Sequence, residues 1–499
     1  MMKKRDFIAA SVSLLVLGWP FCGQAQFSLT GQLRTRTEVR DGYGTLETKG
    51  NTPAFLTSQR ARLIFNYRSS RVIFQTSLQD VRVWGADAST INNADGNRLS
   101  LHEAWADIIL ANTKDSTLPR TAVEYFSIRI GRQELVYDDE RLLGNLDWLQ
   151  QARRHDAIVF KLLHKGWQAD LGAAFNQNSD AIGYNGTYYT PGNVPPYVKD
   201  SKGNLAATPA AMIPLANAAG LSARTGSPVL ATAAGTNGMN QDYKSMQFLY
   251  LAKKFGSTRI AGLAFSDEFA KYSLDSVKNI AGSDTGYIYG RRFNHSGVNT
   301  RVTTGALLTS RLGQKKEWTL QAGYYYQMGK SKDGISLGAY TTTLSLNYVH
   351  RSFSWTAGWD YLKGGFDPLY GTPHKFWGSM DYFYAASGSP AAGLNNPFFK
   401  GKYTSAGGRF SSELAYHYFG FADDAKDNKG NPLSKYLGSE VDATLTYGLN
   451  KITTLQLGYS WMGATHSMEY AKGIAPDAAR LNASWAYLQI NIRPDFFSK

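Results

Sequence analysis

The chain has 499 residues, a formal net charge of +14 and a mean hydropathy of −0.33. This hydropathy excludes a protein built from transmembrane helices, and no apolar run of about 18 residues is present. A single water-soluble core rarely reaches this size, and no linker divides the chain, so a β-barrel with only alternate residues facing lipid fits better.

Residues 1–25 have the features of a secretory signal peptide. The segment begins with basic residues, continues with a short apolar run and ends in the small-x-small sequence Gly23-Gln24-Ala25. We expect cleavage before Gln26, and we expect 26–499 to form a single outer-membrane barrel domain.

Cys22 is the only cysteine of the chain. It leaves open a lipoprotein, but Phe21 precedes it where a lipidation site requires a small residue. We therefore expect Cys22 to be lost with the signal peptide. The exported chain then has no cysteine, which excludes disulfides and thiolate metal sites and suits an oxidising periplasm.

From residue 27 onward, apolar and polar residues alternate in segments of about ten residues. Successive side chains of a strand point to opposite faces, so one set meets lipid and the other a polar interior. The pattern predicts an all-β fold, a closed antiparallel transmembrane barrel of about 18 strands. The predicted strands lie near 27–40, 60–68, 72–79, 99–110, 125–136, 154–163, 167–176, 242–253, 258–268, 298–312, 317–328, 338–349, 353–362, 374–384, 407–421, 437–449, 453–462 and 482–493.

The predicted connections alternate between short periplasmic turns and long outer loops, as such barrels require. Two connections on the periplasmic side, 111–124 and 385–406, are longer than this rule allows. Either could fold inward as a plug or extend into the periplasm. The segment 177–241, rich in Ala, Gly, Pro and Asn, is predicted to be a long surface loop, with a lid or constriction as its functional alternative. Whether any of these three segments gates a pore is left open.

Strand alternation places arginines inside the predicted barrel. On the lipid face near the midplane, each would cost about 2–4 kcal/mol. The arginines on the polar faces are Arg34, Arg36, Arg60, Arg62 and Arg129. The acidic residues expected in the lumen are Glu38, Glu103, Asp107, Asp360, Glu413, Glu440 and Asp442. Since unpaired charge is tolerable only where water is present, we expect a hydrated interior. The arginines could select anions or brace the wall in an Arg–Glu network, and both roles can hold together.

The segment 129–156 carries the most specific motifs. They are Arg129-Ile130-Gly131-Arg132-Gln133-Glu134-Leu135, Asp138-Asp139-Glu140-Arg141-Leu142-Leu143-Gly144, Asp147-Trp148-Leu149 and Arg153-Arg154-His155-Asp156. This pattern resembles the alginate export family of outer-membrane porins. The segments 78–85 and 101–105 also resemble that family, and 366–382 is similar to members from Bacteroidetes-like bacteria. The likeness extends over nearly all of the chain after the signal peptide.

The resemblance implies an eighteen-stranded barrel whose electropositive constriction passes a polyuronate chain, with loops gating both ends. Carried over by motif, Arg132 and either Arg153 or Arg154 are the constriction arginines. The charges paired with the pore arginines are Glu103, Glu134, Asp139, Arg141 and Asp156. Strict alternation points Arg132 away from the side of Arg129, so a lumenal position requires a bulge or a place above the lipid band.

We therefore predict a channel in the outer membrane of a Gram-negative cell that passes anionic saccharides or similar anionic solutes through an arginine-lined pore. The alternative is a general or nutrient-uptake porin with modest anion selectivity. A remote alternative is a barrel enzyme, with His155-Asp156, His102-Glu103 or Asp138-Asp139 as its candidates. Adjacent strand residues point to opposite faces and no serine nucleophile motif is present, so no enzyme is expected.

The expected partners are anionic oligosaccharides, polysaccharides or small anions, outer-membrane lipid and lipopolysaccharide, and the barrel assembly machinery. The basic charge would also suit nucleic acid, but the signal peptide argues against that partner. No cofactor or metal site is predicted. Asp423, Asp424, Asp427 and Asn428 could hold Ca²⁺ in an outer loop, but their spacing fits no calcium-loop pattern and a solvated acidic loop is favoured, so bound calcium is left open. The solute, the transport direction and the oligomeric state are left open.

Overall fold

The structure is a computed structural model that describes residues 26–85, 99–115, 118, 121–176, 194–217, 219–230, 243–293, 297–384, 390–427 and 429–498. The predicted signal peptide, with Cys22, and the loop residue Asn428 lie outside the described residues. Cleavage before Gln26 therefore stays a prediction. Among the described residues, no helix is long and apolar enough to cross a membrane.

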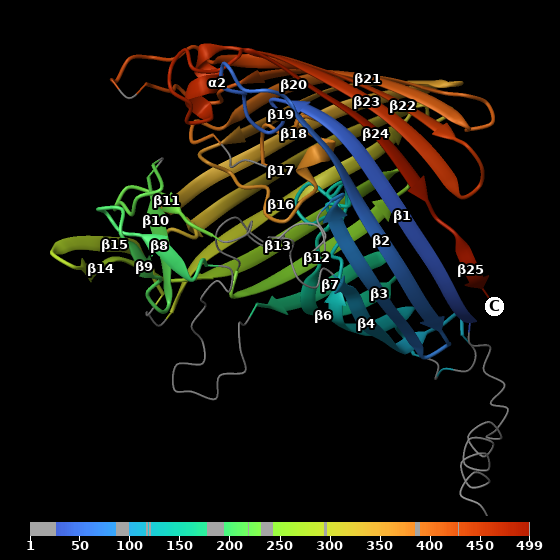
Figure 1. Cartoon of the computed structure of the whole chain (residues 1–499). Helices are drawn as coiled ribbons and strands as arrows, with labels where there is room; N and C mark the ends of the chain where they lie inside the picture. Colours follow the sequence, from blue (N-terminus) through green and yellow to red (C-terminus); the bar gives the residue numbers. More distant parts are fainter. Residues whose placement is uncertain are drawn as a thin grey trace, which may run out of the picture.

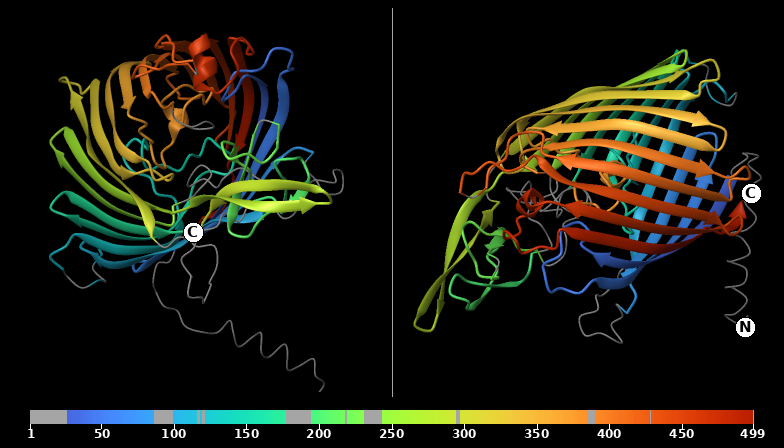
Figure 2. Two further views of the ribbon diagram at one scale, coloured as in Figure 1. Left: turned by 90° about the vertical axis from the view of Figure 1, so that its left-hand side faces the viewer. Right: turned by 90° about the horizontal axis from the view of Figure 1, so that it is seen from above.

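Eighteen antiparallel strands of the described chain form the wall of a closed barrel (Figures 1 and 2). They are β1 (Gln26–Asp41), β2 (Ala54–Arg68), β3 (Val72–Val83), β4 (Leu99–Asn112), β5 (Tyr125–Gln133), β6 (His155–His164), β7 (Trp167–Phe175), β12 (Ser245–Phe255), β13 (Thr258–Ala270), β16 (Val298–Leu312), β17 (Trp318–Lys330), β18 (Ser336–His350), β19 (Phe353–Lys363), β20 (Leu394–Thr404), β21 (Phe410–Gly420), β22 (Tyr436–Gly448), β23 (Thr453–Ala464) and β24 (Asn482–Ile492). Successive wall strands pair, and β1 closes the barrel by pairing with β24. The short β25 (Asp495–Ser498) adds to the first residues of β1. The predicted fold class is confirmed.

One predicted strand, 374–384, is wrong. Pro373–Lys375 form a 3-10 turn, η1, and the wall strand at this place in the order is β20. Met380, Tyr382 and Phe383 are all at most 1% exposed, whereas a wall strand leaves alternate residues uncovered. The apolar residues of this segment pack inside the barrel, and periodicity cannot distinguish that environment from a membrane.

The connections differ in length between the two ends of the barrel. Those that follow β2, β6, β12, β16, β18, β20 and β22 are short turns. The predicted long connection 385–406 is wrong as well, because it contains β20 and leaves only a short turn at 405–409. The connection 113–124 remains the long one on this side.

The long connections gather at the other end and carry structure of their own. Described parts of 177–241 form β8 (Tyr197–Lys199), β9 (Leu205–Ala207), β10 (Met212–Ala216) and β11 (Ser227–Pro228). β10 pairs with β15 (Asp284–Arg292), whose hairpin partner is β14 (Ser273–Ala281). This sheet projects from the barrel (Figure 2). A helix, α2 (His466–Ala471), lies between β23 and β24.

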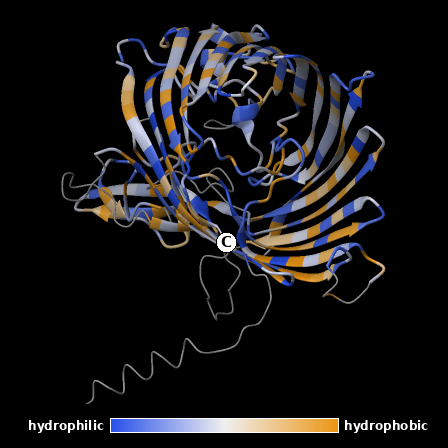
Figure 3. Cartoon of the chain, turned by 90° about the vertical axis from the view of Figure 1, so that its right-hand side faces the viewer, coloured by the Kyte–Doolittle hydropathy of each residue, from blue (hydrophilic) through white to orange (hydrophobic). Residues whose placement is uncertain are grey.

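Hydrophobic and hydrophilic residues alternate along the wall strands (Figure 3). In β12, Leu249 and Leu251 are exposed on the outer face, while Phe248 and Tyr250 are buried on the inner face. The inner face here is therefore apolar rather than wet. It packs against chain segments that enter the lumen, and this packing creates the principal hydrophobic core.

Candidate functional site

Two connections fold into the lumen and contact each other. They are 134–154, between β5 and β6, and 364–384, which follows β19; we call them the loop pair. Leu143 and Tyr370 form an isolated parallel bridge between them. The Tyr370 N–H donates to the Leu142 carbonyl at 2.9 Å, and the Gly144 N–H donates to the Tyr370 carbonyl at 3.0 Å. Figure 2 shows these segments within the ring of strands.

The backbone of 134–154 has unusual torsion angles. Four residues of this loop have positive φ values, which residues other than glycine rarely adopt: Asp138 (52°), Glu140 (69°), Leu146 (48°) and Ala152 (52°). Such residues persist only where the surrounding contacts determine their conformation, and they gather at functional sites. The contacts of the loop pair with the wall therefore indicate where function lies.

Asp147 joins this loop to β1 and β2. Its Oδ1 lies 2.8 Å from Arg60 Nη1 and 3.4 Å from Arg62 Nη1, and its Oδ2 lies 3.3 Å from Arg34 Nη1. Burial alone would raise the pKa of the Asp147 carboxyl, but the three arginines outweigh it and hold this pKa below its ordinary value. Three predicted pore arginines thus converge on one loop carboxylate, an arrangement that matches the bracing alternative.

Arg36 supports the same loop through Trp148. Its Nη1 donates to the Trp148 carbonyl at 2.9 Å, and its guanidinium lies 4.2 Å from the centre of the Trp148 ring. Its Nε lies 3.3 Å from Glu38 Oε2. The other face of Trp148 stacks on His374 of the second loop, with 4.1 Å between ring centres. Arg36 therefore holds the first loop, and Trp148 of that loop packs against the second.

The remaining predicted arginines lie in three different environments. Arg129 pairs with Asp107 at 2.9 Å on the inner face. Arg153 is buried and donates to the Gly371 carbonyl, which ties the two loops together. Arg154 is half-buried.

Arg132 and Asp156 lie on the outer face, contrary to the expectation of a constriction. Their side chains are 37% and 51% exposed, with 2.8 Å between Arg132 Nε and Asp156 Oδ1. They pair across β5 and β6 on the side that also carries Ile130, which is 51% exposed. No bulge intervenes between Arg129 and Arg132, so strict alternation holds.

The paired charges Asp139 and Arg141 lie inside. Arg141 Nη1 is 3.0 Å from Asp360 Oδ2 of β19, and its Nε is 3.4 Å from Asp139 Oδ2. Burial would lower the pKa of Arg141, but Asp360 and Asp139 outweigh it and raise this pKa. Glu103 and Glu134 lie together with His102 on the inner side of β4 and β5.

Most of the predicted lumenal acids are buried, and Asp360, Glu440 and Asp442 contact the loop pair. Glu38, Asp107, Asp360, Glu440 and Asp442 are at most 5% exposed, and Glu103 and Glu413 are half-buried. Glu440 Oε1 accepts a hydrogen bond from the Met380 N–H at 2.8 Å. The expectation of a hydrated interior is wrong for this part of the lumen, because the loop pair fills it.

Arg301 is a buried anchor that was not among the arginines predicted from the sequence. Its guanidinium pairs with Asp267 of β13 and with Asp367 of the second loop, the latter at 2.7 Å. Alternation in β16 could have placed Arg301 inside, because it shares parity with the inward-facing Thr303. Its loop partner could not have been found in this way.

Two cavities lie in the lumen towards the short-turn end. One, of about 390 Å³, is lined by Asp138, Asp139, Lys254, Ser257, Arg259, Leu307, Thr309, Arg311, Lys316 and Gln321. The other, of about 400 Å³, is lined by Thr30, Gly31, Gln32, Arg60, Arg62, Ile64, Asp147, Arg493, Pro494 and Asp495. Each cavity touches the first loop and contains more basic than acidic side chains.

The positions of His155 and Asp156 do not support the enzyme alternative. His155 is buried, with its Nδ1 2.8 Å from the Tyr243 hydroxyl, whereas Asp156 lies on the outer face. The two side chains point to opposite sides of β6, as alternation predicts. They therefore form no acid–base pair.

Comparison with known proteins gives a family match over part of the chain and structural matches over nearly all of it. A model described as alginate export matches residues 25–175, which include β1–β7 and the first loop but not 366–382. The suggested likeness of 366–382 to Bacteroidetes-like members therefore has no support. No curated protein matches the chain.

Three solved structures share the fold. OccAB4 of Acinetobacter baumannii is 11% identical, with a TM-score of 0.55 over 96% of this chain and 100% of that one. OpdO of Pseudomonas aeruginosa is 10% identical, with a TM-score of 0.54 over 94% and 98%. OpdK of the same organism, crystallised with vanillate, is 11% identical, with a TM-score of 0.52 over 95% and 99%. The chain is an outer-membrane β-barrel, and no enzymatic role is indicated.

Proposed function

We propose that this outer-membrane barrel is a channel for anionic saccharides or similar anionic solutes, which pass beside the loop pair. The observation that carries the proposal is a group of basic side chains in the 390 Å³ cavity. Lys254, Arg311 and Lys316 line it, and within the described chain none has a carboxylate oxygen within 4 Å. Uncompensated basic side chains in a narrow lumen attract anions.

The acidic side chains of this cavity are already paired. Asp138 pairs with Arg259, and Asp139 Oδ2 lies 3.4 Å from Arg141 Nε. An arriving anion therefore meets three available cations rather than a balanced network. Arginine and lysine donors suit carboxylate and phosphate groups.

The arginines of β1 and β2 contribute mainly by holding the first loop. Arg34 and Arg60 are at most 4% exposed, and both pair with Asp147. In this proposal they set the width of the passage, while the less buried Arg62 and Arg493 face the second cavity. Direct contact of solute with Arg34 or Arg36, which line neither cavity, would require the loop to move.

The size of the two cavities favours the passage of small solutes, one molecule at a time. Pockets of about 300–1,000 Å³ hold single small molecules. OpdK, which shares the fold, was crystallised with vanillate, a small carboxylate. The nutrient-uptake porin with modest anion selectivity is the second candidate, since the core of the loop pair leaves limited space for a polymer.

The test is a selectivity measurement on the purified barrel in planar bilayers under a KCl gradient. We expect a reversal potential on the anion side and block by an oligouronate but not by a neutral oligosaccharide. Replacing Lys254, Arg311 and Lys316 with Gln should reduce the anion preference several-fold, and Arg132→Gln is the matched control. An unselective wild-type channel without block would contradict the proposal, and block by monomeric acids alone would favour the uptake porin.

A further inference from the structure

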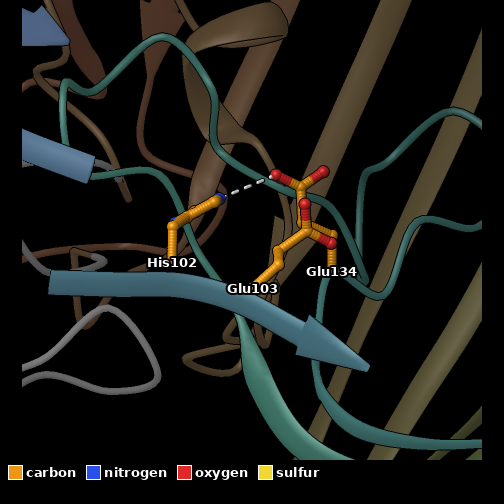
Figure 4. A group of neighbouring side chains, drawn as sticks. All are labelled: His102, Glu103 and Glu134. Atoms are coloured by element: carbon orange, nitrogen blue, oxygen red, sulfur yellow. Dashed lines mark hydrogen bonds and ion pairs between the residues drawn. The ribbon is translucent and has the colours of Figure 1, made fainter. Parts of the chain in front are cut away.

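Three potential metal ligands converge on the inner wall beside the first loop. His102 and Glu103 belong to β4, and Glu134 directly follows β5. Figure 4 shows the three side chains pointing toward one another. His102 Nε2 lies 3.1 Å from Glu134 Oε1, and one ligand atom from each residue lies within 4.8 Å of the others. We propose that this cluster binds a divalent transition-metal ion of the Zn²⁺ class, which fixes the first loop to β4.

A β-bulge explains why two adjacent residues point the same way. In the pairing of β3 with β4, Ser77 lies opposite Glu103 and Leu78 opposite Leu101, so His102 is the extra residue. A bulge breaks alternation and redirects a side chain, and such irregularities are often found beside functional sites. His102 is 0% exposed and Glu103 is half-buried. His102 and Glu103 therefore lie on the same side of β4, although adjacent strand residues ordinarily point to opposite faces.

The ligand set suits a borderline divalent ion. A neutral imidazole and two carboxylates supply two negative charges, which balance a divalent cation. In a tetrahedral zinc site with bonds of about 2.0–2.1 Å, neighbouring ligand atoms are about 3.3 Å apart. The 3.1 Å between His102 Nε2 and Glu134 Oε1 is close to that separation. Three protein ligands would leave a coordination position for water or for an anion from the lumen.

Neutral donors orient both carboxylates. Glu103 Oε2 accepts from Gln75 Nε2 at 2.7 Å, and Glu103 Oε1 accepts from Trp105 Nε1 at 3.0 Å. Glu134 Oε2 accepts from Asn145 Nδ2 at 2.9 Å. These amide and indole contacts resemble the supporting hydrogen bonds of metal sites, which orient ligands and tune the ion.

The described residues place no lysine or arginine within 4 Å of either glutamate. The nearby Arg62 is engaged by Gln79 and by Asp147. These side chains therefore do not supply the directly paired positive charge that a buried carboxylate requires. A bound cation would supply the missing charge.

The cluster is connected to the centre of the first loop. Glu134 Oε2 holds the Asn145 side chain, whose Oδ1 accepts the Asp147 N–H at 3.2 Å. Asp147 is the carboxylate that the wall arginines hold. A metal at Glu134 would therefore stabilise the position of this loop, independently of which solute passes.

Metal binding is tested on the purified full-length barrel in detergent after treatment with EDTA. Co²⁺ titration followed by visible absorption, and then displacement with Zn²⁺, reports a specific site without measuring transport. The variants are Glu134→Gln and His102→Asn. The matched control is His466→Asn, because His466, Glu469 and Asp477 form a second possible cluster in the connection that contains α2.

We expect wild type and His466→Asn to bind one Co²⁺ ion with the same affinity, and both cluster variants to bind at least tenfold more weakly. Heat-dependent mobility on gels checks that each variant is folded. Absence of Co²⁺ binding by wild type, loss of binding in His466→Asn, or unchanged affinity in folded Glu134→Gln and His102→Asn would overturn the proposal. If the cluster variants do not fold, absence of Co²⁺ binding by wild type or loss of binding in His466→Asn still overturns the proposal.

Discussion

Arg60 Nη1 of β2 lies 2.8 Å from Asp147 Oδ1 of the first loop, and the Arg60 side chain is 1% exposed. A guanidinium so deeply buried is stable only with a partner, since an unpaired buried charge is costly. The partner comes from a segment that enters the lumen rather than from the wall. This contact makes the position of the loop part of the stability of the barrel.

Asp147→Asn should loosen the loop and destabilise the barrel. Removing one partner of a fully buried ion pair costs about 3–5 kcal/mol, and we expect about 2 kcal/mol here because Asp147 is 34% exposed. Urea unfolding in lipid vesicles measures the loss, and single-channel recording should show a larger and noisier conductance. Asp156→Asn on the outer face is the control and should change stability by less than about 1 kcal/mol. Equal losses of stability in the two variants would contradict the role of Asp147 in holding the first loop to the wall.

Acid should release the first loop through the same carboxylate. The arginines lower the pKa of Asp147 below 3.8, so the stabilisation is fully present above that pH. It is lost as the pH falls further, through the lowered pKa of the folded state. Conductance of the wild type should stay constant from neutral pH down to about 4 and change below it. In Asp147→Asn this acid-dependent step should disappear, and a step that persists in the variant would assign it to other groups.

Arg132→Gln should leave the ion selectivity unchanged. Arg132 forms an exposed pair with Asp156 on the outer face, away from the lumen. Exposed ion pairs contribute about 0–1 kcal/mol to stability, so the fold should also be retained. The reversal potential under a salt gradient is the measurement, with Arg311→Gln as the lumenal counterpart. If Arg132→Gln shifted the reversal potential as much as Arg311→Gln does, Arg132 would have to reach the passage after all.

Gly131→Ala should disrupt the pairing of β4 with β5. Gly131 has φ +120°, and an added Cβ would lie 2.2 Å from the Ala104 carbonyl oxygen. We expect a loss of at least about 2 kcal/mol, from backbone strain and the clash together. Gly407→Ala is the control, since a Cβ there meets nothing within 4 Å. Thermal unfolding of folded samples compares the two variants, and equal stability would contradict the close approach of the strands.

Alternation predicted the wall because the lipid outside and the lumen inside impose a period of two on each strand. It placed Arg34, Arg60 and Arg129 on the inner face, since a charge in lipid is costly. Alternation also placed Arg132 on the outer face, whereas the family resemblance had placed it inside. Alternation wrongly predicted a wall strand at 374–384, because aromatic residues packed within a lumen are as hydrophobic as residues that face lipid.

The sequence by itself determined the closed barrel, all of its wall strands except β20 and the side of most charges, because these depend on local alternation and on the solvents at each face. Only the tertiary structure decided what the inner arginines contact. Arg60 and Asp147 are far apart in the chain, and a loop enters the lumen only when many such contacts form together. The bulge that brings His102 beside Glu103 likewise depends on the register with β3, which no single strand encodes. The arginines expected to line open water are instead, for the most part, the anchors of the loop pair.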